Sequence, residues 1–297
     1  MCRLSRKFHI YICLFLLYCP IISYCQTLFK LTLNDSHYFI NAPLNGQGHS
    51  NIMLESGIPG ILINEENFNK YFTDSLFVAV DSGYTEIKSF YGNHNVNSIR
   101  YGKVYIGDVV YEGTIYVIDK YDQIGVPVHL LQSMNDSTNN LVQIDFRNNT
   151  LSFIRRDSII GLKLHQYVMK EIIPEPIIET TLWLSDRDGH NGVIKGDFIL
   201  DFGNRTPLFL FYRNSIVSQF LKNNNYSLST AKDQKGRNVG YGIYANLCKV
   251  GNKSVKNVSV GISNRIKISN TMGSIGPSMY ASSFLIFDTK NMLVYYQ

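Results

Sequence analysis

Two short segments of the chain each end an apolar run with a carboxylate, one variable residue and a glycine. They are Glu55-Ser56-Gly57 in the first half of the sequence and Asp201-Phe202-Gly203 in the second. Carboxyl groups are common general acids and bases in enzymes. Two of them held about 3 Å apart cannot both ionise, so they share one proton. The chemistry open to this chain depends on whether its fold brings Glu55 and Asp201 face to face.

The order of sequence features around the two carboxylates is repeated. Each half continues into a hairpin, with its turn at Gly107-Asp108 or Gly251-Asn252, where we expect the residue after glycine to tolerate a positive φ. A closing pair of strands follows, and there Asp145 matches Asp288. The interval from carboxylate to hairpin glycine is 52 residues in one half and 50 in the other, and from that glycine to the aspartate it is 38 and 37. The agreement predicts a duplicated unit of roughly 120 residues.

Strands are expected to position these segments. The chain has 20 Tyr and 17 Phe against one Trp, and aromatic side chains favour β-sheets. The ranges 30–44 and 178–201 are typical of hairpins, and Asp188-Gly189 marks the second turn. Short helices are expected at 64–72 and 213–224. The sequence therefore predicts an all-β fold with a few short helices.

The division between the two units is expected near residues 170–179, where Pro174 and Pro176 interrupt any regular element. The predicted organisation is a leader at 1–25, a first unit at 26–169 and a second at 170–297.

The chain resembles the two-lobed aspartic peptidases of the pepsin and retropepsin kind, over essentially all of its length after residue 25. In that family the loop consists of two apolar residues, an aspartate, a threonine or serine, and a glycine. Its counterparts here are Met53-Leu54-Glu55-Ser56-Gly57 and Ile199-Leu200-Asp201-Phe202-Gly203. The resemblance implies an all-β, pepsin-like bilobal fold, with a peptide or protein substrate in the cleft between the lobes and no cofactor. It implies that Glu55 and Asp201 are the catalytic pair, in which the ionised member takes a proton from a water and the protonated member donates to the scissile carbonyl.

The other loop residues take supporting and binding roles by the same resemblance. Glycine at positions 57 and 203 lets the backbone turn tightly, and a hydroxyl such as that of Ser56 ties one loop to the other. The family also covers its site with a flap that usually carries a tyrosine. The range 83–103 is in the right place, with Tyr91 as the candidate tip and Tyr84 and Tyr101 as rivals. The alternative for each tyrosine is an ordinary core or surface aromatic residue.

Three departures from the family pattern weaken the case for catalysis. Glu55 replaces aspartate, and one extra methylene moves a carboxylate by roughly 1.5 Å, while a misplacement of 1 Å can cost on the order of 100-fold in rate. Phe202 replaces the second hydroxyl residue. An apolar-apolar-glycine element supports each family loop. Ser274-Ile275-Gly276 resembles it in the second half, but the nearest counterpart in the first half, around His129-Leu130-Leu131, has no glycine.

The N-terminus has the pattern of a signal peptide. Basic Arg3, Arg6 and Lys7 precede an apolar stretch at 10–22, and cleavage is expected before Gln26. The protein is then exported, to the periplasm or the extracellular space, with membrane contact only through an uncleaved leader. The alternatives are a retained membrane anchor and a lipid on the cysteine at position 25.

Charge and cysteine content narrow the function classes. Loss of the leader lowers the net charge from +5 to +2, which argues against nucleic acid as a partner. Cys248 is then the one remaining cysteine, and we expect a buried, inert thiol.

Other catalytic patterns have little support. No paired-histidine motif indicates zinc, so no metal site is predicted. The Asp186-Arg187-Asp188-Gly189 segment lacks the glutamate that closes a calcium loop, and a hairpin turn explains it better. Three readings of the function remain: an exported aspartic endopeptidase, a catalytically degenerate relative that binds peptides or other ligands, and a peptidase active only within an assembly or at acid pH.

Overall fold

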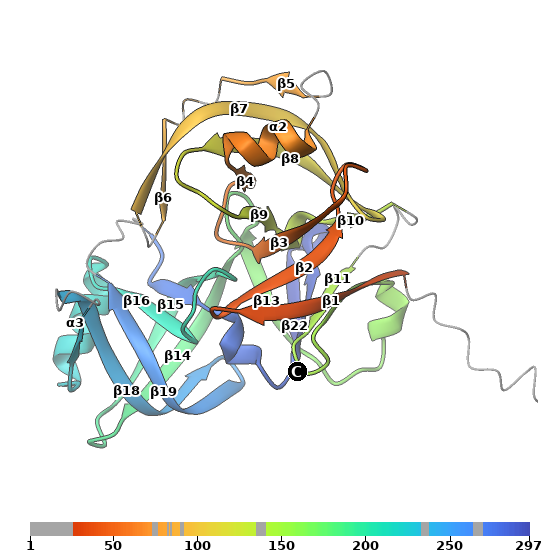
Figure 1. Ribbon diagram of the computed structural model, residues 1–297. Coiled ribbons are helices and arrows are strands. Elements are labelled where there is room, and N and C mark those ends of the chain that lie inside the picture. The colour runs from red at the N-terminus through yellow and green to blue at the C-terminus, as the bar shows by residue number, and fades with distance from the viewer. Residues whose placement is uncertain are drawn as a thin grey trace, which may run out of the picture.

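The computed structural model describes residues 26–72, 77–81, 83, 85–89, 92–134, 141–232, 238–263 and 270–297 (Figure 1). The predicted leader and the tip residue Tyr91 lie outside these ranges, as does Tyr84. Among the described helices, none has the length and apolar character needed to cross a membrane.

A six-stranded antiparallel sheet joins the two halves of the chain. Its order is β1 (Gln26–Asn34), β12 (Thr150–Ile154), β11 (Leu141–Asp145), β21 (Phe284–Asp288), β22 (Leu293–Tyr296) and β13 (His165–Glu171). The halves meet between β11 and β21, where Val142 pairs with Phe287. The predicted closing strand pairs are therefore confirmed, and they lie side by side.

The first half builds a sheet from its remaining strands. In order of pairing these are β2 (His37–Pro43), β3 (His49–Glu55), β9 (Ile124–Pro127), β4 (Ile61–Ile63), β8 (Val109–Ile118) and β7 (Gly92–Ile106). Three short strands pair with β7 or β8: β5 (Val78–Ala79), β6 (Glu86–Ser89) and β10 (Gln132–Ser133). Strand β1 extends past the central sheet and pairs with β2.

The second half repeats this order. Its strands are β14 (Ile177–Asp186), β15 (Asn191–Leu200), β20 (Gly273–Ile275), β16 (Leu208–Phe211), β19 (Lys253–Ser263), β18 (Asn238–Val250) and β17 (Ser229–Lys232). In both halves a parallel, an antiparallel and a parallel pairing follow one another: β3–β9–β4–β8 in the first and β15–β20–β16–β19 in the second. The repeat predicted from sequence spacing is thus a repeat of strand order.

The two predicted helices are confirmed as α2 (Glu65–Tyr71) and α3 (Ser215–Asn223). Each begins after an asparagine whose side chain accepts from backbone N–H groups of the first turn, Asn64 from Asn67 and Asn214 from Ile216 and Val217. The described part of the chain also holds four short 3₁₀ helices: η2 (Val128–Leu130), η3 (Arg156–Ile159), η4 (Pro277–Tyr280) and η5 (Thr289–Asn291).

The hairpin turns match between the halves, with one correction. Gly107 joins β7 to β8 and Gly251 joins β18 to β19, at φ values of 58° and 56°. The positive φ therefore falls on the glycine, and neither Asp108 nor Asn252 adopts it. Glycine takes this conformation without a steric penalty, so the following residue has no need to.

Aromatic and aliphatic side chains from both halves form one large core, as the composition predicts. Phe153, Phe198, Phe202 and Phe287 are among its largest fully buried members. Cys248 is fully buried, and burial raises the pKa of its thiol to about 12. The prediction of a buried, inert cysteine is confirmed.

Candidate active site

Glu55 and Asp201 lie at the ends of equivalent strands, β3 and β15, and each approaches the loop of the other half. A methyl group on Gly57 would lie 2.9 Å from Asp201 Oδ1, and one on Gly203 would overlap Glu55 Oε2. Each carboxylate therefore occupies the space that the glycine of the opposite loop leaves open. The structure brings together the two carboxylates that the sequence singled out.

Ser56 ties the two loops to each other. Its Oγ donates to the carbonyl of Leu200 (2.5 Å) and accepts from the backbone N–H of Phe202 (2.8 Å). Leu200 donates to the carbonyl of Pro176 across the hairpin (2.9 Å), but proline has no N–H to return that bond. The Ser56 hydroxyl, which is fully buried, supplies the donor for the Leu200 carbonyl instead.

The side chain of Phe202 has no hydroxyl to form a reciprocal tie, and it packs in the core instead. It is 2% exposed, and its ring lies 5.9 Å from that of Phe146 and 6.1 Å from that of Phe287. Both neighbours belong to or adjoin the central sheet strands β11 and β21. Hydrophobic contact therefore anchors the second loop where the family uses a hydroxyl.

The two carboxyl groups differ in how readily they ionise. Burial and the charge of Asp201 raise the pKa of Glu55 well above its ordinary value. Burial raises the pKa of Asp201 to about 6, against the opposing effect of hydrogen bonds from the backbone of Gly203 and Asn204 and from the side chain of Ser274. The Gly203 N–H donates to Asp201 Oδ1 (2.9 Å), and hydrogen bonds of this kind favour the charged form of Asp201.

The segment Ser274-Ile275-Gly276 supports the second loop, as expected. Strand β20 runs parallel to β15, and the backbone N–H of Asp201 donates to the carbonyl of Ile275 (2.9 Å). Asn204 Nδ2 donates to both the carbonyl (3.2 Å) and the hydroxyl (3.1 Å) of Ser274. These contacts fix the loop that carries Asp201.

The expected counterpart in the first half is wrong by a few residues. Val126 of β9 pairs with Leu54 as Ile275 pairs with Leu200, so Pro127 stands where the second half has Gly276. The position expected for it, around His129, lies in the following 3₁₀ helix η2. Parallel pairing of β9 with β3 determines this alignment, and it leaves no local sequence signal.

The surroundings of His129 indicate a structural role. It is buried, and Nε2 lies 3.0 Å from the carbonyl of Ile172. Burial lowers the pKa of His129 to about 4, so the ring is neutral.

Sequence reasoning missed three groups beside the carboxylates. A methyl group on Gly125 would lie 2.5 Å from Tyr121 Oη and 3.5 Å from Glu55 Cγ, which places this phenol next to Glu55. Burial and the charge of Glu55 raise the pKa of Tyr121, so the phenol stays protonated. The ring of His37 hydrogen-bonds the backbone of Gly203. Glu175 lies near Asp201, and burial together with the Asp201 charge raises its pKa to about 7.

The structure describes part of the segment 83–103 that is expected to form the flap. Strands β6 and β7 pair as an antiparallel hairpin in which Ser89 lies opposite Gly92. The candidate tip Tyr91 and its rival Tyr84 lie outside the described residues. Tyr101 lies on β7 opposite Val78 and is 46% exposed.

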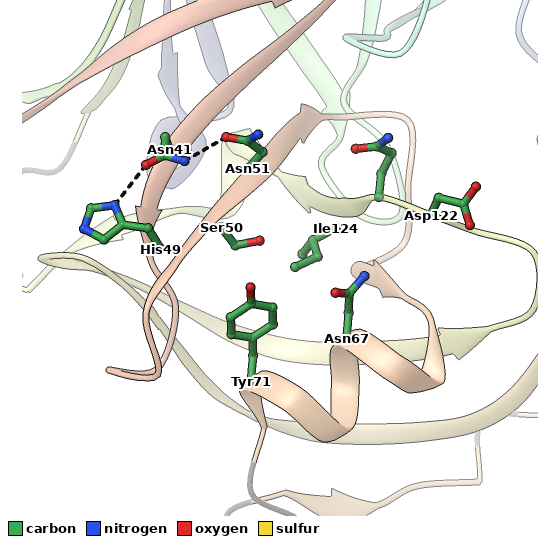
Figure 2. A pocket seen from close by; sticks show the side chains of 9 residues that line it. Asn41, His49, Ser50, Asn51, Asn67, Tyr71, Asp122 and Ile124 are labelled. Carbon is green, nitrogen blue, oxygen red and sulfur yellow. Dashed lines mark hydrogen bonds between the residues drawn. The ribbon is translucent and has the colours of Figure 1, made fainter.

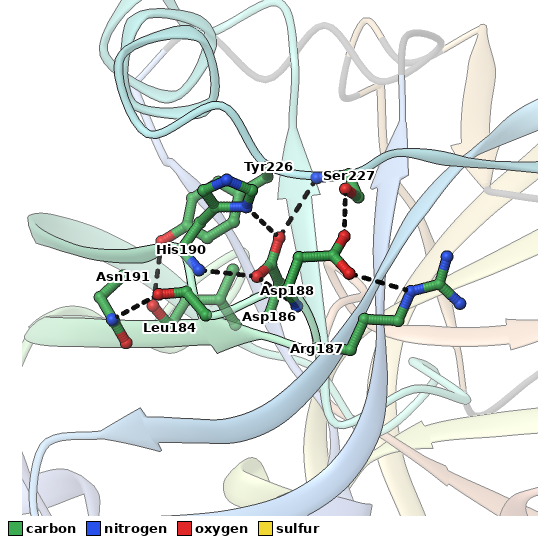
Figure 3. A network of polar contacts seen from close by, with 9 residues as sticks. Leu184, Asp186, Arg187, Asp188, His190, Asn191, Tyr226 and Ser227 are labelled. Atoms are coloured by element: carbon green, nitrogen blue, oxygen red, sulfur yellow. Dashed lines mark hydrogen bonds and ion pairs between the residues drawn. The ribbon is translucent and has the colours of Figure 1, made fainter.

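The hairpin between β14 and β15 holds a cluster of ionisable side chains (Figure 3). Asp186, Asp188 and His190 place one ligand atom each within 4.8 Å of one another. Asp186 already accepts from the backbone of Asp188 (3.0 Å), His190 (2.9 Å) and Ser227 (3.3 Å), and from His190 Nδ1 (3.0 Å). These donors occupy the Asp186 carboxylate, which stabilises the turn predicted at Asp188-Gly189.

A polar pocket of about 370 Å³ lies in the first half, between α2, strands β2 and β3, and the segment before β9 (Figure 2). Neither Glu55 nor Asp201 lines it. Asn41 links two of its walls, since Nδ2 donates to Asn51 Oδ1 (2.8 Å) and Oδ1 lies 2.9 Å from His49 Nδ1. The pocket is therefore separate from the paired carboxylates.

Comparison with solved structures identifies the fold. The chain is similar to the crystal structure of the aspartic proteinase from Irpex lacteus, with a TM-score of 0.55 and 13% sequence identity over 91% of this chain and 96% of that one. A scan of sequence families and a search of curated proteins found no match. At this identity the similarity establishes an aspartic-proteinase-like, mostly β fold.

Proposed function

We propose that this protein is an exported aspartic peptidase with an unusual Glu55/Asp201 pair. The proposed organisation is bilobal, with lobes at 26–169 and 170–297 after a signal peptide at 1–25. An extended peptide or protein substrate would lie between the lobes and pair with strand edges.

One observation carries the proposal: each carboxylate fills the space beside the glycine of the opposite loop. The extra methylene of Glu55 raised the concern that its carboxylate would miss the position an aspartate takes. Its contact with Gly203 matches the contact of Asp201 with Gly57, so both carboxylates have the same relation to the opposite loop. This reciprocal arrangement supports a working pair.

The different surroundings of the two carboxyl groups support separate roles for them. Asp201, whose carboxylate accepts hydrogen bonds that favour its charged form, would be the ionised member that takes a proton from a water held between the carboxylates. Glu55 would stay protonated and donate a hydrogen bond to the scissile carbonyl, which polarises it for attack. Because the pKa of Asp201 is about 6, we expect the singly protonated pair near neutral pH as well as at mildly acid pH.

A catalytically degenerate, peptide- or ligand-binding relative is the second candidate. Two observations favour it: Pro127 occupies the position of a supporting glycine, and Phe202 forms no hydroxyl tie.

Substitution of the pair distinguishes the candidates. We expect Asp201→Asn to abolish peptide cleavage and Glu55→Asp to retain or raise it. A protein that binds peptides equally well with either carboxylate removed, and cleaves none, would be the binding module.

A further inference from the structure

The two halves place different residues beside their carboxylates at equivalent positions of the sheet. In the second half Ile199 of β15 pairs with Ser274 of β20. In the first half Met53 of β3 pairs with Gly125 of β9. Ile199 and Met53 each stand two residues before the carboxylate of their half. The repeat therefore places Gly125 where the second half has Ser274.

Ser274 gives Asp201 a hydroxyl partner. Its Oγ hydrogen-bonds the Asp201 carboxylate and accepts from Asn204 Nδ2 (3.1 Å). The amide of Asn204 occupies a lone pair of this oxygen, so the one proton of the hydroxyl is donated to Asp201. A donor of this kind favours the charged form of a carboxyl group.

Gly125 has no hydroxyl, and the phenol of Tyr121 takes that place. A methyl group on Gly125 would lie 2.5 Å from Tyr121 Oη and 3.5 Å from Glu55 Cγ, so both groups adjoin the same point. Cγ is the extra methylene that distinguishes glutamate from aspartate. The side chain that Gly125 lacks therefore leaves room for the phenol next to the side chain of Glu55.

Tyr121 is packed on its other side by strand β7. The ring of His94 on β7 meets the Tyr121 ring edge-on, with their centroids 5.9 Å apart. Tyr121 also packs against an apolar cluster that includes Ile87 and Ile99. The phenol is partly buried and stays protonated, so its hydroxyl is a hydrogen-bond donor beside Glu55.

We propose that Tyr121 is a positioning residue whose hydroxyl donates to the Glu55 carboxylate, as the Ser274 hydroxyl donates to Asp201. The inference rests on the proposed peptidase function and adds a residue to its machinery. In the attack step water adds to the scissile carbonyl, Asp201 takes a proton from that water, and the proton of Glu55 moves to the carbonyl oxygen. Glu55 ends this step as a carboxylate, which is the form that the phenol stabilises.

The ionisation of Glu55 tests this inference without any need for cleavage. Protein with ¹³C-labelled glutamate is titrated by NMR, and Glu55→Gln identifies the Glu55 signal by its loss. Tyr121→Phe removes the hydroxyl alone. It should raise the midpoint of the Glu55 titration by about one pH unit or more, a change of about tenfold that matches one hydrogen bond to a charged group.

Other titratable groups near Glu55 stay the same in this variant. Asp201 faces Glu55 from the opposite loop. His94 contacts the Tyr121 ring, and His37 on β2 hydrogen-bonds the backbone of the opposite loop. A shift of the Glu55 midpoint therefore reports the loss of the phenol hydroxyl.

Two further variants serve as control and rescue. Tyr105→Phe makes the same change at an exposed position of β7 and should leave the midpoint unchanged. Tyr121→Phe/Gly125→Ser moves a hydroxyl to the position equivalent to Ser274 and should return the midpoint towards the wild-type value. An unchanged midpoint in Tyr121→Phe would overturn the inference, as would an equal shift in Tyr105→Phe. A midpoint that stays raised in the double variant would contradict the equivalence with Ser274.

Cleavage by the same variants separates this inference from the proposed function. If the wild-type protein cleaves peptides, Tyr121→Phe should lower kcat by about tenfold or more and leave KM nearly unchanged, because the hydrogen bond forms after the substrate has bound. An unchanged kcat would overturn the inference. If the wild-type protein cleaves none, the proposed function fails, and the NMR titration alone decides whether the phenol donates to Glu55.

Discussion

Removal of the Ser56 hydroxyl should destabilise the protein more than its size suggests. Ser56→Ala takes one oxygen from a fully buried site and leaves both the Leu200 carbonyl and the Phe202 N–H without their partner. Pro176 cannot replace the donor for Leu200, because it has no N–H. An unsatisfied buried polar group costs about 1–3 kcal/mol, so we expect the free energy of unfolding to fall by about 2–6 kcal/mol.

Urea unfolding measures this loss, with the single tryptophan, Trp183 on β14, as the fluorescence probe and circular dichroism as a second probe. Ser218→Ala is the matched control, because this serine is only partly buried on the surface helix α3. Its hydroxyl donates to the carbonyl of Ser215 (2.9 Å), and its loss should cost less than about 0.5 kcal/mol. Ser56→Thr keeps the hydroxyl and should recover most of the stability. A Ser56→Ala protein as stable as the Ser218→Ala control would refute the argument that this hydroxyl joins the loops.

Three further changes follow from the same geometry. Asp201→Asn should flatten the pH dependence of stability. The wild-type fold raises the pKa of Asp201 from 3.8 to about 6, so between these pH values the folded protein binds more protons than the unfolded chain. The free energy of unfolding of the wild-type protein therefore falls by on the order of 3 kcal/mol as the pH rises through this range. If urea unfolding between pH 4 and 7 gives the same slope of stability against pH for Asp201→Asn and the wild-type protein, the reasoning is wrong. Phe202→Thr restores the family hydroxyl but removes a ring packed against Phe146 and Phe287, so the free energy of unfolding should fall by about 3 kcal/mol or more. Thermal or urea unfolding measures this loss, and a variant as stable as the wild-type protein would contradict the packing role. Gly203→Ala should abolish peptide cleavage because its methyl overlaps Glu55 Oε2, while Gly242→Ala, with its nearest contact at 3.4 Å, should not; equal rates would show that the Glu55 carboxylate lies elsewhere.

Much of the fold is predictable because its signals are local. Glycine at positions 107 and 251 marks equivalent turns. Asp145 and Asp288, matched by spacing alone, both accept from backbone N–H groups of the turn that follows, those of Arg147 and Asn148 in one half and of Asn291 in the other. Turn chemistry of this kind is written in a few neighbouring residues.

The environment of the carboxylates is less predictable because tertiary pairing creates it. Pro127 takes its place from the parallel pairing of β9 with β3, and Glu175 lies near Asp201 in the bend that precedes β14. Tyr121 approaches Glu55 through the packing around Gly125. None of these neighbours has a fixed spacing from Glu55 or Asp201 that a sequence pattern could reveal.

Cleavage of a diverse peptide library by the purified protein from pH 3 to 8 tests the central claim most directly, with Asp201→Asn as the control. The proposed pair predicts cleavage by the wild-type protein that is lost in the control and blocked by a statine-type inhibitor. Absence of cleavage at every pH by a folded protein would contradict a working Glu55/Asp201 pair, as would cleavage that persists in Asp201→Asn.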